Sequence, residues 1–305
     1  MAFSIGLRIY KIEIQPDGGK GALPLTRDQS TSDLYQFFSD FIASHGASND
    51  RDDIQRSWDI EPPKDNSVNY LRGFINYGTF GFRSKFRDRK TKKSKYQRQV
   101  NDVEEIPLYY QFWFPDKVNY AFLALQSFQT RSCVTLVLKT STEFFRARNS
   151  NRRLSFKKLM PEDLKGSAFY SSPVKKVTLI RKSVPSDVPD QYLNGTSRSE
   201  AEYQVSIVAK RRRKLGTLFD FMKKETAKDT SLLEFDGETF DEASVEIAVG
   251  NKRRKIGVLG FNSDAGVIEL GESVTIGPEG HPTYESMKKE TDTIMADFFK
   301  TLREK

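Results

Sequence analysis

The sequence has few of the residues that several common kinds of site require. Cys133 is the only cysteine among 305 residues, so neither an intrachain disulfide nor a cysteine metal cluster can form. His45 and His281 are the only histidines, too few for a zinc site built on three of them. Disulfide scaffolds and the cysteine-rich or histidine-rich zinc sites are therefore excluded.

Long apolar runs are also absent. The most apolar stretch without charges, residues 118–128, is much shorter than the roughly 20 residues of a membrane-spanning helix. Residues 1–8 lack the basic region and long apolar segment of a secretory signal. We therefore expect a cytoplasmic protein without membrane insertion.

The sequence contains none of the common nucleotide or hydrolase motifs. It has no Walker A loop, no Gly-x-Gly-x-x-Gly fingerprint and no Gly-x-Ser-x-Gly elbow. These absences argue against the usual nucleotide-binding folds and against a serine hydrolase. No cofactor is expected from the motifs.

Aromatic residues are abundant, and 23 Phe, 12 Tyr and 2 Trp can fill a sizeable core. Alternating apolar residues predict antiparallel strands, and helical spacing predicts a few packing helices. The expected fold is therefore α+β, with a C-terminal amphipathic helix over residues 284–302. The other expected elements are a strand over 3–14, a helix over 31–44, a polar loop over 45–66, a long strand or hairpin over 70–86, strands over 106–114 and 120–128, a helix or strand plus helix over 131–148, strands over 173–184 and 203–210, a short helix over 215–224, and a hairpin over 244–250 and 255–261.

Two parts of the chain are expected, 1–150 and 151–305, although one domain is also compatible with this length. In the first part, the segments 70–86, 106–114 and 120–128 predict an aromatic antiparallel meander. The second part carries the remaining strands and the C-terminal helix. The polar stretch between Asn149 and Pro161 is the expected boundary.

The positive charge is concentrated in four clusters. Residues 83–98 hold nine Lys or Arg against one Asp, a surplus of +8 that equals the net charge of the whole chain. Residues 139–158 carry +6, residues 210–214 carry +5 and residues 252–255 carry +4. These clusters total +23, so the remainder carries −15. Such segregation is typical of a polyanion site, where each Lys or Arg near a phosphate releases counterions.

Our first hypothesis is nucleic-acid binding, with DNA and RNA both open. The aromatic residues near the first cluster could stack on unpaired bases, and they are Tyr77, Phe80, Phe82, Phe86 and Tyr96. An individual basic run is more often a solvated loop, and it can also attract anionic lipid, phosphorylated metabolites or an acidic protein. The side chains that we expect to contact phosphate are Arg87, Arg89, Lys90, Lys92, Lys93, Arg211, Arg212, Arg213, Arg253 and Arg254.

The second hypothesis is a Mg²⁺-dependent nuclease, since two or three carboxylates can hold this ion. Only this alternative requires a metal. The Asp…Glu-x-Lys spacing of many nucleases is missing, and acidic loops are usually solvated. The candidate acids are Asp236, Glu238, Asp241, Glu242 and Glu246.

The third hypothesis is a protein-interaction subunit. Its aromatic sheet and C-terminal helix would bind a protein partner or a second copy of the chain, and the basic clusters would face an acidic surface.

Three passages resemble those of a known group of proteins. They are residues 71–78, residues 107–115 with 122–126, and the Gly280-His281-Pro282-Thr283 turn. In this order they resemble uncharacterised bacterial proteins of about 300 residues found near phage-defence genes. The resemblance implies a bacterial origin and a role as a sensor or subunit of an anti-phage defence system. It carries no catalytic signature.

Overall fold

The computed structural model confirms an α+β fold with a strand-rich antiparallel sheet. Within its described part lie three helices, α1 (Thr31–Ser44), α2 (Val134–Arg146) and α4 (Tyr284–Arg303). The structure describes residues 4–18, 31–65, 67–129, 131–160, 171–184, 193, 196–197, 199, 201–211, 213–218, 220, 234–235, 238–249, 252–260, 266–271 and 273–303.

The chain forms two compact units. Unit 1 comprises Met1–Arg8 with Lys158–Lys305, and unit 2 comprises Ile9–Lys157. Strand β1 (Ile5–Pro16) therefore begins in unit 1 and ends in unit 2. Its alternating isoleucines and leucine are buried, as the expected strand over 3–14 requires.

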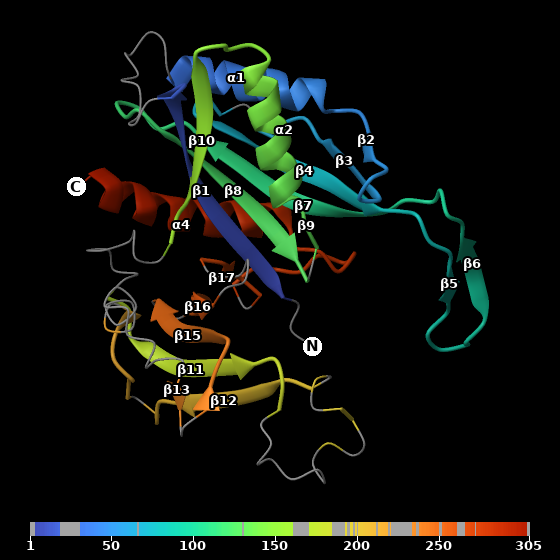
Figure 1. The fold of residues 1–305 in the computed structure, drawn as a ribbon, viewed down its shortest axis with the longest axis vertical. Coiled ribbons are helices and arrows are strands. Elements are labelled where there is room, and N and C mark those ends of the chain that lie inside the picture. Colours follow the sequence, from blue (N-terminus) through green and yellow to red (C-terminus); the bar gives the residue numbers. More distant parts are fainter. Residues whose placement is uncertain are drawn as a thin grey trace. The chain divides into compact units, whose positions relative to one another are not determined.

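Unit 2 is built on an antiparallel meander (Figure 1). β7 pairs antiparallel with β4 on one side and with β8 on the other, which confirms the predicted meander. The strand order is β1-β8-β7-β4-β3-β2, with β10 also pairing β1 and β9 pairing β8. The strands are β2 (Asn49–Arg51), β3 (Arg56–Ile60), β4 (Tyr70–Thr79), β7 (Glu104–Trp113), β8 (Ala121–Phe128), β9 (Arg131–Ser132) and β10 (Arg152–Lys158).

One expectation for unit 2 is wrong. Residues 45–66, predicted as a polar loop, contain β2 and β3. Trp58 and Ile60 alternate on β3 and are buried at the edge of the meander, where Trp58 lies opposite Tyr77. The strand is only five residues long and carries Arg56 and Asp59, so its polar flanks hide the alternation.

Helices α1 and α2 pack on this sheet through aromatic rings. Phe38 of α1 stacks on Phe112 of β7 with ring centroids 4.2 Å apart. Phe37 meets Phe145 of α2 edge to face at 5.2 Å. The predicted helix over 31–44 is confirmed, and residues 131–148 prove to be a short strand followed by α2. Most of the meander's aromatic residues are therefore core.

The chain leaves the meander between β4 and β7 and forms a separate hairpin. β4 ends at Thr79, and Gly81 adopts a φ of +98°, a conformation that disfavours side chains. β5 (Ser84–Arg87) and β6 (Ser94–Arg98) then pair only with each other, and Figure 1 shows them projecting from the unit. The segment 70–86, predicted as one long strand or a hairpin, instead holds two strands that do not pair with each other, β4 and β5, and β6 was not predicted.

Unit 1 carries a second group of antiparallel strands, in the order β12-β11-β15-β16-β17-β1. The predicted hairpin is confirmed, because β15 and β16 pair up to Val249 and Lys252. Half of the predicted helix over 215–224, including 221–224, lies outside the described residues. The strands are β11 (Val174–Arg181), β12 (Tyr203–Val208), β13 (Glu234–Phe235), β14 (Glu238–Thr239), β15 (Glu242–Val249), β16 (Lys252–Gly260) and β17 (Ile268–Glu269).

The predicted C-terminal helix is confirmed as α4. Its apolar side chains Met287, Ile294, Met295 and Phe298 are buried, as their helical spacing requires. In the part of the chain that the structure describes, no helix is long and apolar enough to cross a membrane.

Candidate nucleic-acid interface

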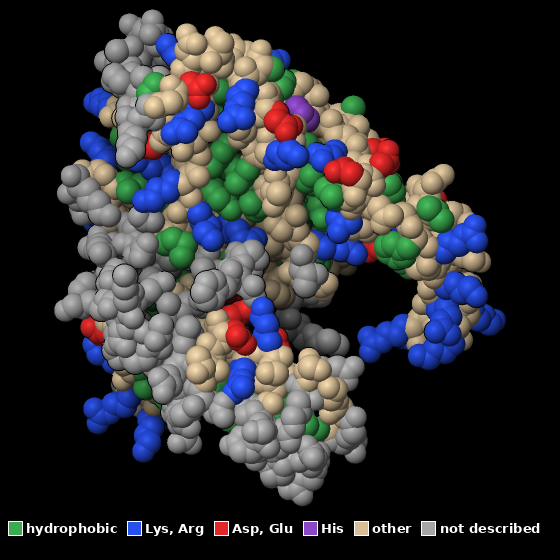
Figure 2. Space-filling model, in the orientation of Figure 1, with side chains coloured by type: hydrophobic (Ala, Val, Ile, Leu, Met, Phe, Trp, Pro, Cys, Tyr) green, Lys and Arg blue, Asp and Glu red, His purple; other side chains and the backbone are tan. Residues whose placement is uncertain are grey.

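The most basic part of the chain is the projecting hairpin, residues 84–98, which we call the arm. Eight of the nine bases in residues 83–98 have exposed side chains. Figure 2 shows Lys and Arg side chains gathered on the arm. Among the described strands, β5 and β6 pair only with each other, so both edges of this two-stranded ribbon lack a neighbouring strand.

Asp88, the only acid of the arm, organises the turn at its tip. One carboxylate oxygen accepts the backbone N–H groups of Thr91 and Lys90 at 2.8 and 2.9 Å. Lys95 lies 3.1 Å from the other oxygen. The hydrogen bond from Thr91, followed by those from Lys95 and Lys90, holds the pKa of Asp88 below its ordinary value. Lys92 adopts a φ of +61°, and its N–H donates to the backbone carbonyl of Asp88.

The arm has an aromatic face. Phe86 on β5 lies opposite Tyr96 on β6, with nearly parallel rings whose centroids are 6.1 Å apart. The two residues remain 45% and 52% exposed, so about half of each is open to solvent among the residues that the structure describes. Side chains alternate along a strand, which places Lys85 and Arg87 on the other face. The ribbon therefore presents aromatic rings on one side and cations on the other.

Arg98 attaches the base of the arm to the sheet. Its side chain is 2% exposed and donates to Glu104 at 3.1 Å, to the backbone carbonyl of Asp102 at 3.1 Å and to the carbonyl of Thr79. The guanidinium also lies over the ring of Phe82 at 4.2 Å. Arg98 was counted among the charges of the first basic cluster, but it is used within the fold.

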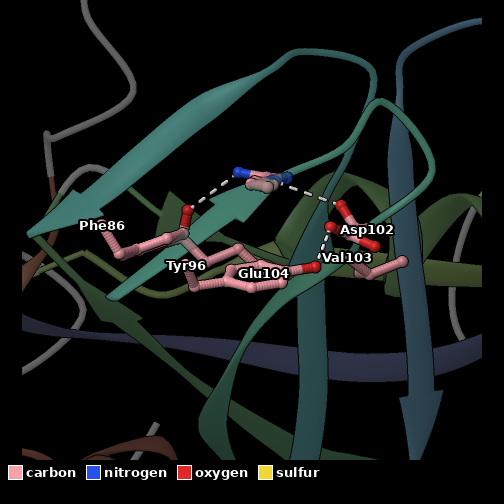
Figure 3. A pocket seen from close by; sticks show the side chains of 6 residues that line it. Phe86, Tyr96, Asp102, Val103 and Glu104 are labelled. Carbon is pink, nitrogen blue, oxygen red and sulfur yellow. Dashed lines mark hydrogen bonds and ion pairs between the residues drawn. The ribbon is translucent and has the colours of Figure 1, made fainter. Parts of the chain in front are cut away.

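A recess of about 350 Å³ lies beside the aromatic face, at the base of the arm. Figure 3 shows Phe86 and Tyr96 side by side, with the Tyr96 hydroxyl directed at Asp102, to which it donates a hydrogen bond. This bond raises the pKa of Tyr96 and lowers that of Asp102. The recess is lined by Phe86, Tyr96, Arg98, Asp102, Val103 and Glu104.

The sheet of unit 1 brings two of the three other predicted clusters, 210–214 and 252–255, to one of its ends. Strand pairing places Val208, Lys176, Glu246 and Lys255 in one row across β12, β11, β15 and β16. The turn after β12 and the first residues of β16 both extend beyond this row. They are three strand spacings apart, about 14 Å. We call this the basic end of unit 1, and its exposed cations are Lys210, Arg211, Arg213, Lys214, Arg253 and Lys255.

The structure places most of the ten predicted phosphate-contacting residues at the surface. Arg87 lies on β5, and Arg89, Lys90, Lys92 and Lys93 lie in the tip of the arm, all exposed. The remaining exposed predictions belong to the basic end of unit 1. Arg212 and the side chain of Arg254 lie outside the described residues.

Two of the five carboxylates predicted for a nuclease site have basic partners. Glu246 accepts a hydrogen bond from Arg253 at 3.1 Å, and Glu242 lies 3.7 Å from Lys182. Asp241 accepts the backbone N–H of Lys182. Asp236 and the side chain of Glu238 lie outside the described residues. Among the residues that are described, no three acids, histidines or cysteines are grouped to hold a metal.

The apolar surfaces of the interaction hypothesis are largely internal. Tyr109, Tyr110 and Phe112 of the aromatic sheet are at most 2% exposed, and the apolar residues of α4 are buried too. Tyr70, Phe74 and Trp113 of the sheet and Phe299 of α4 are half-buried, so these surfaces are mostly but not wholly internal.

Sequence reasoning missed the aromatic face as a unit. It grouped Tyr77 with Phe86 and Tyr96, whereas Tyr77 lies on β4 and is buried. The spacing of Lys85, Phe86 and Arg87 against Lys95, Tyr96 and Gln97 was the available signal. In each triplet one ring lies between two polar residues, as on an exposed ribbon. Comparison with protein-family models and with curated proteins finds no match to the chain.

Proposed function

We propose that this protein binds nucleic acid, with the arm as its main contact surface. The observation that carries the proposal is the exposure of eight cations on and beside a hairpin that no further strand covers. Phosphate contacts with such side chains release condensed counterions, a term that supplies most non-specific affinity for nucleic acid.

A purely structural role explains the arm poorly. An isolated two-stranded hairpin is marginally stable in water, and like charges held together oppose folding. The cation that fixes the base, Arg98, is buried and differs from the exposed ones. A bound polyanion would offset the repulsion among the exposed side chains, which supplies a functional reason for their clustering.

The biological role belongs to the same proposal. We place the protein in the bacterial cytoplasm, as a sensor or subunit of an anti-phage defence system that detects or holds nucleic acid. The resemblance of residues 71–78, 107–115, 122–126 and 280–283 to proteins encoded near phage-defence genes supports this role.

The test is a binding titration over a salt series with labelled DNA and RNA. Affinity is expected to fall steeply with salt. The double variant Lys92→Gln/Lys93→Gln should reduce the slope of log K against log salt by about 1.4–1.8, because each phosphate contact contributes about 0.7–0.9. The matched control is Lys288→Gln/Lys289→Gln on α4, which should leave the slope unchanged. Absence of binding at about 50 mM salt, where this electrostatic contribution is strong, would refute the proposal.

A further inference from the structure

Exposed apolar surface is concentrated around the arm. Of the nine large apolar side chains exposed in the described residues, five lie between positions 82 and 103. They are Phe82, Phe86, Tyr96, Val100 and Val103. Large apolar groups in water are costly, and such a patch commonly marks a binding site.

The charge around these rings decides what kind of partner fits. A lone apolar patch would suit another protein, but this one lies among eight exposed cations of the same stretch. Unpaired nucleotides satisfy both features, because their bases offer flat apolar faces and their backbone carries phosphates. Aromatic stacking platforms inside positively charged grooves are the usual solution of proteins that bind single strands.

We propose that the aromatic face of the arm stacks unpaired bases, so that the preferred ligand is single-stranded nucleic acid. This inference rests on the proposed nucleic-acid binding and specifies its substrate class. Phe86 and Tyr96 form the stacking platform, since their near-parallel rings are exposed side by side on one face of the ribbon. The cations of the tip and of the opposite face hold the phosphates.

The recess provides room for a base beyond the platform. Its volume of about 350 Å³ is within the range of small-ligand pockets, about 300–1,000 Å³. Hydrogen bonds fix the polar side chains that line the recess. Asp102 accepts from the Tyr96 hydroxyl and from the Gln99 N–H, and Glu104 accepts from Arg98. The base-binding surface is therefore preorganised, which lowers the ordering cost of binding.

Duplex nucleic acid would use the arm differently. Its bases are stacked and paired, so their faces are hidden from the rings. A two-stranded ribbon can enter a major groove, but there it contacts base edges and phosphates. Removing a ring should therefore weaken single-strand binding selectively, while removing cations should weaken both.

The experiment measures fluorescence anisotropy at one salt concentration. The probes are an unstructured 20-nucleotide DNA, the matching RNA and a 20-base-pair duplex. Tyr96→Ala is expected to weaken binding of the single strands by about 5- to 150-fold, the usual range for loss of one stacked base. Duplex binding should change less than twofold. Tyr96→Phe is the matched control, because it keeps the ring and should retain at least half of the single-strand affinity.

The outcomes separate this inference from the proposed function. If Lys92→Gln/Lys93→Gln and Tyr96→Ala both leave all binding unchanged, the proposed function fails. The stacking inference alone fails if the lysine variant weakens binding while Tyr96→Ala weakens binding of single strands and duplex equally. It also fails alone if Tyr96→Ala weakens binding of neither probe. If Tyr96→Ala converts a dimer to a monomer in light scattering without changing binding, the aromatic face is a protein interface and the inference is overturned.

A second readout avoids the effects of a misfolded arm. An oligonucleotide carrying one 2-aminopurine reports stacking directly, since its fluorescence falls when a ring covers the base. Quenching on binding is expected with the parent protein and with Tyr96→Phe. Weaker quenching is expected with Phe86→Leu, which keeps an apolar side chain but removes the ring. Quenching by Phe86→Ala/Tyr96→Ala equal to that of the parent protein would exclude the platform.

Discussion

Arg98 and Glu104 form an ion pair, with nitrogen and oxygen 3.1 Å apart, that joins the last residue of β6 to the first residue of β7. A second cation, Arg131, contacts the other carboxylate oxygen at 2.6 Å. This relationship connects the arm to the meander at the point where the chain re-enters the sheet. It also makes Arg98 different from every exposed cation that precedes it in the arm.

Arg98→Ala is therefore expected to destabilise unit 2 by about 1–3 kcal/mol, because buried hydrogen-bond acceptors lose their donor. Chemical denaturation measures the loss, and hydrogen exchange of the β5 and β6 amides locates it. The control is Lys95→Ala, an exposed neighbour on β6, which should change stability by less than about 0.5 kcal/mol. Equal effects of the two substitutions would show that the buried guanidinium does not anchor the arm.

The basic end of unit 1 should add to nucleic-acid affinity. Arg211→Gln/Arg213→Gln removes two exposed cations and should lower the salt slope by about 1.4–1.8. Titration against the same labelled probes measures it. Lys182→Gln is a single-charge control near the opposite end of β11, next to Glu242. An unchanged slope in the arginine variant would restrict binding to the arm.

Glu269 gives unit 1 a defined dependence on pH. Burial raises the pKa of this carboxyl above its ordinary value of 4.5, although it accepts hydrogen bonds from the Ile5 N–H at 2.5 Å and from Ser4. Because the folded-state pKa is raised, the protonated carboxyl contributes to the stability of the fold. This contribution is complete below about pH 4.5 and is lost as pH rises through the folded-state pKa.

Glu269→Gln keeps an acceptor and cannot ionise. Its melting temperature should equal or exceed that of the parent at pH 7, and the difference should shrink as pH falls toward 4. Scanning calorimetry at several pH values measures this. Glu279→Gln, in an exposed turn, is the control and should show no such trend. A difference that is constant with pH would mean that Glu269 ionises normally.

Binding should not require a divalent metal. Glu246 is paired with Arg253, and we expect that EDTA leaves affinity unchanged and that no cleavage of plasmid or RNA follows addition of Mg²⁺. A gel mobility shift with each probe measures the affinity, and electrophoresis after incubation with plasmid or RNA measures cleavage. Cleavage that stops with EDTA and is lost in Glu246→Ala would instead establish the nuclease alternative.

The sequence predicted the elements whose periodicity is long or pure. β1, β7, β8 and α4 have apolar residues in regular positions, and burial follows that pattern. β3 was missed because two apolar residues in a five-residue strand cannot establish a period. β6 was missed because its alternation is almost entirely polar, and no core selects its residues.

The positive charge of the candidate site was predictable from the sequence, but the arrangement of its side chains was not. Nine bases within residues 83–98 are visible in the sequence, whereas the pairing of Phe86 with Tyr96 depends on the turn at Asp88 and a bulge before Arg87. The burial of Arg98 follows from a contact with the carbonyl of Thr79, at the end of another strand. Such partners follow from the fold, which composition does not specify.

The turn at the tip of the arm rests on one carboxylate and on backbone groups. Asp88 accepts from the main chain of Lys90 and Thr91, so the side chains of Arg89, Lys90, Lys92 and Lys93 are not needed for its shape. Acetylation of these lysines would therefore remove charge stepwise while the loop kept its conformation. The number of positive charges on the tip can therefore change, through modification or through mutation, while the conformation of the turn stays the same.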